Sequence, residues 1–441
     1  MKKLKTGIAV MVMLMAGLAV EAQNGINSPY SQFGIGLSDA PYNSPFAMSR
    51  GAILARGETN QINIWNPGSY GKITSQSFVF DLGLGVQMST LRDGNTKQFD
   101  ADGLVAYLSI GFPLCKWWKT VFSVQPYSDV SYGLTTYSTD TSSYGKMKTL
   151  YEGNGGVNRF TWGHGFNIGS RVSLGFNVHL LYGHIERGIT YDFEANDTTF
   201  YIDSRKQKDT RVLNWGVDFG LNYEQPIGEK YTMTMGLTLK PGWEQGVKEN
   251  ALVYTFAESS GNEYMRDTIF PLSGESGEYR SKLIDNWRVG IGLSLERNER
   301  WLVGFDYVWA QWNGMKYQEG LDYHIFGSDM LEYGAYHRIG VGFEWLGDAQ
   351  GAKYWQRIGY SAGIHYEANK LNMVKEGQEH NIGEIGAGLG VRLPMRKGKS
   401  VINVAVGYSH FGESALLQRD CFTIGVSLGS CESWFVKRKY N

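Results

Sequence analysis

From Ser77 almost to its end, the chain alternates large apolar residues with small or polar ones. In a β-strand, successive side chains point to opposite faces, so this alternation gives each strand two different faces. A continuous apolar face opposite a small, polar one suits a wall with lipid outside and a filled or wet lumen inside. In the first such run, the apolar face would hold Phe78, Phe80, Leu82, Leu84, Val86 and Met88.

Fourteen strands are predicted by this alternation, an even number. Short connections follow the even-numbered strands and mostly longer ones follow the odd-numbered strands, which is typical of an outer-membrane barrel with both termini in the periplasm. The fold class we predict is therefore all-β, a 14-stranded antiparallel transmembrane β-barrel. The predicted ranges are about 78–88, 102–112, 118–132, 156–168, 172–190, 210–223, 231–240, 283–296, 301–311, 334–345, 355–366, 383–393, 401–411 and 421–429.

Composition agrees with an exported β-protein. Glycine accounts for 57 of the 441 residues, aromatic residues for 14% and charged residues for only 19%, below the usual quarter. Tryptophans at strand ends are expected to form the aromatic girdles at the two membrane interfaces. They are Trp117, Trp118, Trp301, Trp309, Trp345 and Trp355.

The stretch before the first strand, residues 23–76, has neither a period of two nor a long amphipathic helix. It is rich in Gly, Asn, Ser and Pro, yet it carries large apolar residues that a disordered linker would lack. We predict that residues 23–76 form a hatch inside the lumen and that residues 77–441 form the barrel. The residues assigned to the hatch are Phe33, Phe46, Leu54, Trp65, Asn66, Pro67 and Gly68.

Residues 1–22 have the pattern of a secretory signal peptide. Lys2, Lys3 and Lys5 form a basic start, residues 7–19 are apolar, and residues 20–22 offer a small-residue cleavage site. An uncleaved anchor helix is the alternative, but the apolar run is short for one.

Neither charge nor cysteine usage indicates a nucleic-acid or metal protein. The net charge of −1 gives no global field to attract nucleic acid. Cys421 and Cys431 lie ten residues apart on one predicted strand, roughly 33 Å, so they cannot bond to each other. A bridge between Cys115 and Cys431 stays open. The eight histidines are scattered and no spacing resembles a zinc site, so we expect no metal, no cofactor and no enzyme activity.

The sequence resembles the long-chain fatty acid transporter (FadL-like) family of outer-membrane channels. Asn66-Pro67-Gly68, just before the first strand, matches the family's Asn-Pro-Ala signature with Gly in place of Ala. The hatch-then-fourteen-strand layout covers the mature chain, and Pro126 interrupts the third strand, where the family has a kink that opens the wall sideways. The stretch 28–34 and the ending 434–439 resemble the version found in Bacteroidota.

The resemblance implies passive uptake of hydrophobic or amphipathic small molecules through a hatch-gated barrel, with lateral exit at Pro126. The alternative to a kink is that the membrane part of the third strand ends early at Pro126, with residues 127–132 beyond the bilayer. Inward charges would either pair with one another and the hatch or meet a substrate head group. The predicted lumen charges are Asp81, Arg159, Asp218, Arg288, Asp306, Arg338, Arg357 and Arg392, with Glu344 and Glu384 beside them.

A second role stays open, that of an accessory barrel subunit in an outer-membrane protein secretion or barrel assembly complex. The long loops, rather than the lumen, would then carry the function. The expected location is the Gram-negative outer membrane, and the expected partners are outer-membrane lipid, a hydrophobic ligand and other outer-membrane proteins.

Overall fold

The computed structural model describes residues 28–32, 34–36, 44–94, 96–138, 146–193, 202–259, 262–271, 279–284, 287–297, 300–311, 317–318, 331–332, 335–375, 378–395, 400–413 and 416–433. The predicted signal peptide, Phe33 of the predicted hatch, and the ending 434–439 lie outside these residues.

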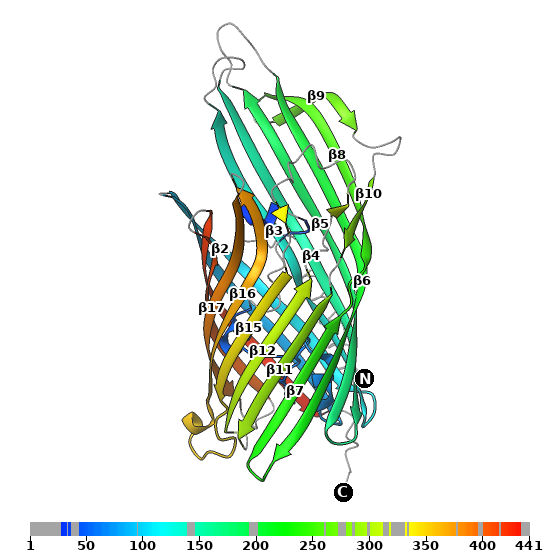
Figure 1. The fold of residues 1–441 in the computed structure, drawn as a ribbon, viewed down its shortest axis with the longest axis vertical. Coiled ribbons are helices and arrows are strands. Elements are labelled where there is room, and N and C mark those ends of the chain that lie inside the picture. Colours follow the sequence, from blue (N-terminus) through cyan, green and yellow to red (C-terminus); the bar gives the residue numbers. More distant parts are fainter. Residues whose placement is uncertain are drawn as a thin grey trace, which may run out of the picture.

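A closed antiparallel sheet dominates the described chain (Figure 1). Fourteen of its strands form the barrel wall, and the ring closes where β1 pairs with β19. The wall strands are β1 (Ser77–Asp93), β2 (Thr96–Pro113), β3 (Trp118–Ser138), β4 (Met147–Ile168), β5 (Val172–Phe193), β6 (Asp203–Ile227), β7 (Tyr231–Lys240), β11 (Arg288–Arg297), β12 (Trp301–Gln311), β15 (Ala335–Trp345), β16 (Gly359–Lys375), β17 (Gln378–Pro394), β18 (Ser400–Gly412) and β19 (Gln418–Ser433). The predicted fold class is therefore confirmed.

Five further strands lie in the connections: β8 (Glu244–Ser259), β9 (Asn262–Pro271), β10 (Tyr279–Ile284), β13 (Tyr317–Gln318) and β14 (Leu331–Glu332). The expectation of a plain loop over 241–280 was wrong, because β8 pairs with the extended end of β6 over Asp203–Val212. The wall is therefore uneven, and β3, β4, β5, β6 and β8 rise above most other wall strands in Figure 1. We call this end of the barrel the loop end and the opposite one the turn end.

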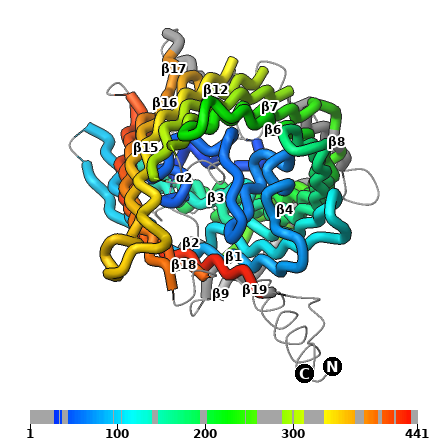
Figure 2. Tube along the Cα trace, turned by 90° about the horizontal axis from the view of Figure 1, so that it is seen from below, coloured from blue at the N-terminus to red at the C-terminus, as the bar shows by residue number. Residues whose placement is uncertain are grey.

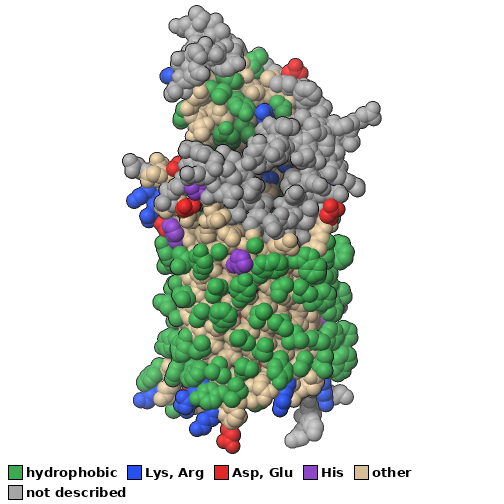
Figure 3. All heavy atoms as spheres, in the orientation of Figure 1, with side chains coloured by type: hydrophobic (Ala, Val, Ile, Leu, Met, Phe, Trp, Pro, Cys, Tyr) green, Lys and Arg blue, Asp and Glu red, His purple; other side chains and the backbone are tan. Residues whose placement is uncertain are grey.

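The alternation also assigned the faces correctly. On β12, Val303 and Phe305 are more than 40% exposed, whereas Leu302, just before them, and Asp306, just after them, are buried. Figure 3 shows the hydrophobic side chains as a continuous belt, with Lys and Arg gathered at the turn end below it. An outward apolar belt of this kind is the lipid-facing surface of an outer-membrane barrel. No helix in the described part of the chain is long and apolar enough to cross a membrane.

The described residues 28–32, 34–36 and 44–73 lie inside the barrel (Figure 2). Their helical pieces are η1 (Pro29–Gln32), α2 (Pro45–Arg50) and η2 (Pro67–Lys72), while η4 (Tyr354–Arg357) lies in a turn of the wall. The hydroxyl of Ser44 caps α2 by accepting a hydrogen bond from the amide of Ala47, and Gly51 ends the helix with a φ of 65°. We call the described residues 28–36 the upper plug and residues 44–73 the lower plug.

β2 and β3 pair only at the turn end, between residues 108–113 and 119–124. Beyond this point β2 continues along β1 to Thr96, whereas β3 continues along β4 to Ser138. Because the described residues of β2 and β3 are not paired with each other beyond Leu108 and Val124, the hydrogen-bond ladder of the wall is interrupted between these two strands toward the loop end. β3 itself continues through Pro126 for twelve further residues, to Ser138.

Candidate functional site

Buried side chains of the wall bind the backbone of the lower plug. Asp306, which is fully buried, accepts hydrogen bonds from the amides of Ile53 at 2.5 Å and Leu54 at 2.9 Å. Asp81 does the same for Ile62 at 3.2 Å. Hydrogen bonds to a charged group contribute about 1.5–3 kcal/mol each, so these carboxylates hold the plug's irregular backbone firmly in place.

The Asn66-Pro67-Gly68 sequence forms a further attachment to the wall. Pro67 begins η2, and the Asn66 side-chain oxygen accepts a hydrogen bond from the Gly68 amide. The Asn66 side-chain amide donates to the carbonyl of Leu54 and to the side-chain oxygen of Asn222 on β6, both at 2.7 Å. The motif thus joins two parts of the lower plug to the wall, and its proline supplies the fixed φ that starts the turn.

Inward glycines let the lower plug approach the wall to within backbone distance. A Cβ at Gly342 would collide with the carbonyl oxygen of Arg50, and one at Gly388 would lie 2.6 Å from the amide of Ser49. Glycines in contact with the lower plug occur on thirteen of the fourteen wall strands: Gly83, Gly111, Gly165, Gly175, Gly220, Gly236, Gly292, Gly304, Gly342, Gly363, Gly388, Gly407 and Gly425.

Glu58 of the lower plug is the centre of an ion network with three arginines. Its carboxylate contacts Arg50 at 3.1 Å, Arg56 at 2.8 Å and Arg392 of β17 at 2.6 Å. Arg56 also pairs with Glu344 of β15. Burial alone would raise the pKa of the Glu58 carboxyl, but Arg392, Arg56 and Arg50 together hold it well below its usual range.

A cavity of about 60 Å³ lies inside the lower plug, against β1, β2 and β3. At about 10–15 Å³ for each water, it has room for a few water molecules. Its lining combines apolar residues with charged ones, among them Phe46, Trp65, Arg50, Glu58, Asp81 and Tyr107. The space is too small for a long alkyl chain, so any such molecule could pass only if the plug moved.

The inner faces of β4, β5 and β6 divide the lumen into three tiers. Nearest the loop end, Val157, Ile185 and Val212 bury Ile35 of the upper plug. Nearest the turn end, Gly165, Gly175 and Gly220 receive the lower plug. The middle tier lies between the two plugs and is polar.

The middle tier consists of charged groups next to aromatic rings. A carboxylate oxygen of Asp218 on β6 lies 2.6 Å from Nε2 of His179. Asp218 also interacts electrostatically with Arg288 and Lys240. Arg159 on β4 lies over the ring of Trp65 at 5.1 Å and over that of Tyr127 at 5.8 Å. Three cations, Arg159, Arg288 and Lys240, surround the Asp218 carboxylate in this tier.

Tyr127 belongs to the place where the third strand is irregular. Pro126 pairs with Asn158 and Ser128 with Val157, so Tyr127 is the extra residue of a bulge. The bulge begins two residues past Val124, the last residue of β3 that pairs with β2. The middle tier therefore lies against the point where the wall is interrupted.

The predicted lumen charges divide into three groups. Asp81, Asp306, Arg338 and Arg392 contact the lower plug, and Arg159, Asp218 and Arg288 form the middle tier. Glu384 and Glu344 are buried as expected. Arg357 was wrongly placed, because it lies in η4 and β16 begins only at Gly359.

Sequence reasoning missed Glu58, His179, Lys240 and Tyr127. Glu58 lies in a stretch without a period, so alternation could assign it no face. Lys240 follows the alternation of Gly236 and Thr238, and Tyr127 follows that of Ser123 and Gln125, so the inward positions of both could have been noted. His179 does follow the alternation of β5, and its inward position could have been noted.

The three cysteines are free in the structure, so the Cys115–Cys431 bridge is not formed.

Comparison with known proteins supports the barrel and gives a family. A family model described as BamG matches residues 1–441. No curated protein sequence matches the chain. Among solved structures, a FadL homologue from Pseudomonas aeruginosa has a TM-score of 0.53 at 11% identity, covering 87% of this chain and 96% of that one.

Two further channels have the same fold. The toluene transporter TbuX of Ralstonia pickettii gives a TM-score of 0.52 at 11% identity, over 88% of this chain and 100% of that one. The monoaromatic hydrocarbon channel CymD gives 0.52 at 11% identity, over 89% and 99%. At such low identity these similarities establish the fold.

Proposed function

The chain belongs to the BamG family, and from the geometry of its lumen we propose that it is an outer-membrane channel for passive uptake of hydrophobic or amphipathic small molecules. The substrate class we propose is that of long-chain fatty acids, with an alkyl part and an anionic head group. The turn end faces the periplasm in this proposal, because short turns lie on that side in outer-membrane barrels. The predicted hatch, residues 23–76, is the gate.

One observation carries the proposal: the middle tier lies against the interruption between β2 and β3. Its cluster of cations suits a carboxylate, which would accept charge-assisted hydrogen bonds from Arg159. Trp65 and Tyr127 beside Arg159 suit the adjoining apolar part. A molecule held here would leave sideways, past Pro126, into the membrane. The solved channels of the same fold, a toluene transporter and a monoaromatic hydrocarbon channel, agree with a hydrophobic substrate.

Replacing Arg159 with glutamine tests this site. Loss of a hydrogen bond to a charged group costs about 1.5–3 kcal/mol, so uptake of a long-chain fatty acid at limiting concentration is expected to fall roughly tenfold or more. Uptake is measured in proteoliposomes with a labelled fatty acid. Arg92→Gln is the matched control, because Arg92 pairs with Asp420 at an exposed position. Equal uptake by the two variants, or none by the unaltered protein, would contradict the proposal.

A second candidate function is an accessory subunit of an outer-membrane protein secretion or barrel assembly complex. Two observations favour it: membership of the BamG family, and the cavity inside the lower plug, which has room for only a few waters. In this role the plugs would be permanent, and the raised wall of β6, β8, β9 and β10 would offer the docking surface.

Native extraction in mild detergent, followed by mass spectrometry, separates the two functions. The accessory role predicts stoichiometric co-purification of other outer-membrane proteins and its loss when residues 244–284 are replaced by a short linker. It also predicts that Arg159→Gln leaves the complex intact. A monodisperse single barrel carrying bound lipid would exclude the accessory role and support uptake.

A further inference from the structure

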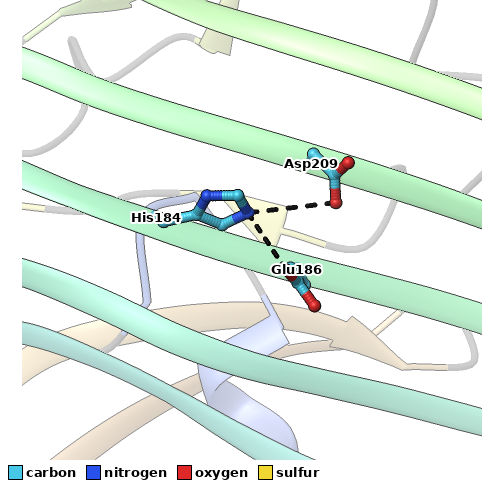
Figure 4. Close-up of side chains that lie close together, drawn as sticks. All are labelled: His184, Glu186 and Asp209. Carbon is cyan, nitrogen blue, oxygen red and sulfur yellow. Dashed lines mark ion pairs between the residues drawn. The ribbon is translucent and has the colours of Figure 1, made fainter. Parts of the chain in front are cut away.

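β5 and β6 bring together three metal-ligating side chains outside the lumen (Figure 4). His184 and Glu186 lie two residues apart on β5, hence on one face, and Asp209 of β6 is the direct partner of Glu186. The His184 Nε2 atom lies 3.3 Å from a carboxylate oxygen of Glu186 and 4.0 Å from one of Asp209. All three ligand atoms lie within 4.8 Å of one another.

The cluster lies on the outward face, directly beyond the lipid-facing belt. Tyr182 lies on β5 two residues nearer the turn end than His184, and it faces outward. Leu213 lies on β6 four residues nearer the turn end than Asp209, with 71% of its surface exposed. The side chains of the cluster are themselves exposed, at 43% for His184 and 62% for Glu186. They are therefore the polar group at the loop-end border of the belt on these two strands, and they are accessible to ions in solution.

Electrostatics makes this arrangement costly without a cation. Glu186 and Asp209 are directly opposite across two strands, and like charges in that position destabilise a sheet. Gln207 donates a hydrogen bond to Asp209 at 3.4 Å, and Arg211 is the strand partner of His184, but neither lies between the two carboxylates in the register. A divalent ion shared by both carboxylates would remove the repulsion.

We propose that His184, Glu186 and Asp209 bind a divalent metal ion of the zinc type. Two ligands at about 2.0–2.2 Å from a tetrahedral zinc ion lie roughly 3.3–3.6 Å apart, which matches the His184–Glu186 separation. The imidazole nitrogen favours zinc or a similar transition metal over calcium or magnesium, which prefer oxygen ligands only. Three protein ligands leave one position open to the exterior. This site is independent of the lumen and of either proposed function.

Titration of the tag-free protein in detergent with zinc chloride, followed by calorimetry, tests the site. The expected result is one saturable equivalent, with affinity weakened at least tenfold by His184→Gln and again by Asp209→Asn. His380→Gln is the control, because His380 contacts a single carboxylate, that of Glu413 at 3.1 Å. Both ligand variants alter exposed side chains, and the heat-dependent gel shift of each barrel shows that it is folded.

No saturable binding, or binding that both ligand variants retain, would overturn the site. Equal loss in His380→Gln would show general surface binding and would overturn it as well. Displacement of zinc by millimolar calcium would overturn the assignment to a zinc-type metal.

Discussion

Alanine at Gly342 is expected to release the lower plug from the wall. Its Cβ would collide with the carbonyl oxygen of Arg50, and a strand position cannot retreat without breaking its ladders. Overpacking of this kind costs about 1–3 kcal/mol, which raises the population of the displaced plug roughly fivefold to more than a hundredfold. Trypsin cleavage after Arg50 and Arg56 is the measurement, because Arg56 is 6% exposed in the closed form and Arg50 is only partly exposed.

Gly133→Ala is the matched control, since it adds the same methyl group to β3 at a place with no heavy atom within 4 Å. Equal cleavage of the two variants would show that the close approach at Gly342 does not hold the plug. Conductance in planar bilayers gives a second reading: a displaced plug opens the lumen, and Gly133→Ala should remain closed.

Glutamine at Glu58 is expected to have the largest effect on the lower plug. The substitution leaves Arg50, Arg56 and Arg392 around a neutral side chain, and breaking a buried ion pair by removing one partner costs about 3–5 kcal/mol. Because its pKa is lowered in the folded protein, the carboxylate contributes fully above about pH 4.3, the ordinary value, and its contribution is lost as the pH falls below that. Trypsin cleavage after Arg56 and bilayer conductance at neutral pH measure the effect.

Glu224→Gln serves as the control for Glu58→Gln. Glu224 of β6 also pairs with the lower plug, through Lys72 at 2.6 Å, but this pair is partly exposed and is expected to contribute at most about 1 kcal/mol. If the Glu58 network holds the plug, Arg392→Gln added to Glu58→Gln should restore part of the protection, because it removes one unpaired cation. Cleavage equal to that of Glu224→Gln would contradict the role of the network.

Strand alternation located the wall well wherever one face meets lipid. The ranges 231–240 and 301–311 agree with β7 and β12 to the residue. The alternation failed to locate strands where the contrast between an apolar and a polar face ends. β6 begins at Asp203 rather than near residue 210, and β8 was missed, because beyond the belt both faces of these strands carry polar residues. β16 begins at Gly359 because the preceding aromatic residues form η4 in a turn.

The interior was predictable in kind but not in detail. Irregular backbone must find hydrogen-bond partners when it is buried, so inward carboxylates such as Asp81 and Asp306 could be expected to bind it. Which amide each would bind depends on how residues 44–73 fold back on themselves, and no periodicity encodes that path. The metal-ligand cluster was also invisible, since His184 and Asp209 meet only through the register of β5 on β6.

Phe46 has a consequence for the order of assembly. Its ring lies at the seam where β1 meets β19, 3.0 Å from the position of a Cβ on Gly83 and 2.9 Å from one on Gly425. The first part of the chain to be made is thus enclosed where the first and last strands of the wall meet. If β1 and β19 paired before Phe46 had reached its place, the lower plug would be left outside the barrel. We therefore expect the ring to close only after the lower plug has folded inside it.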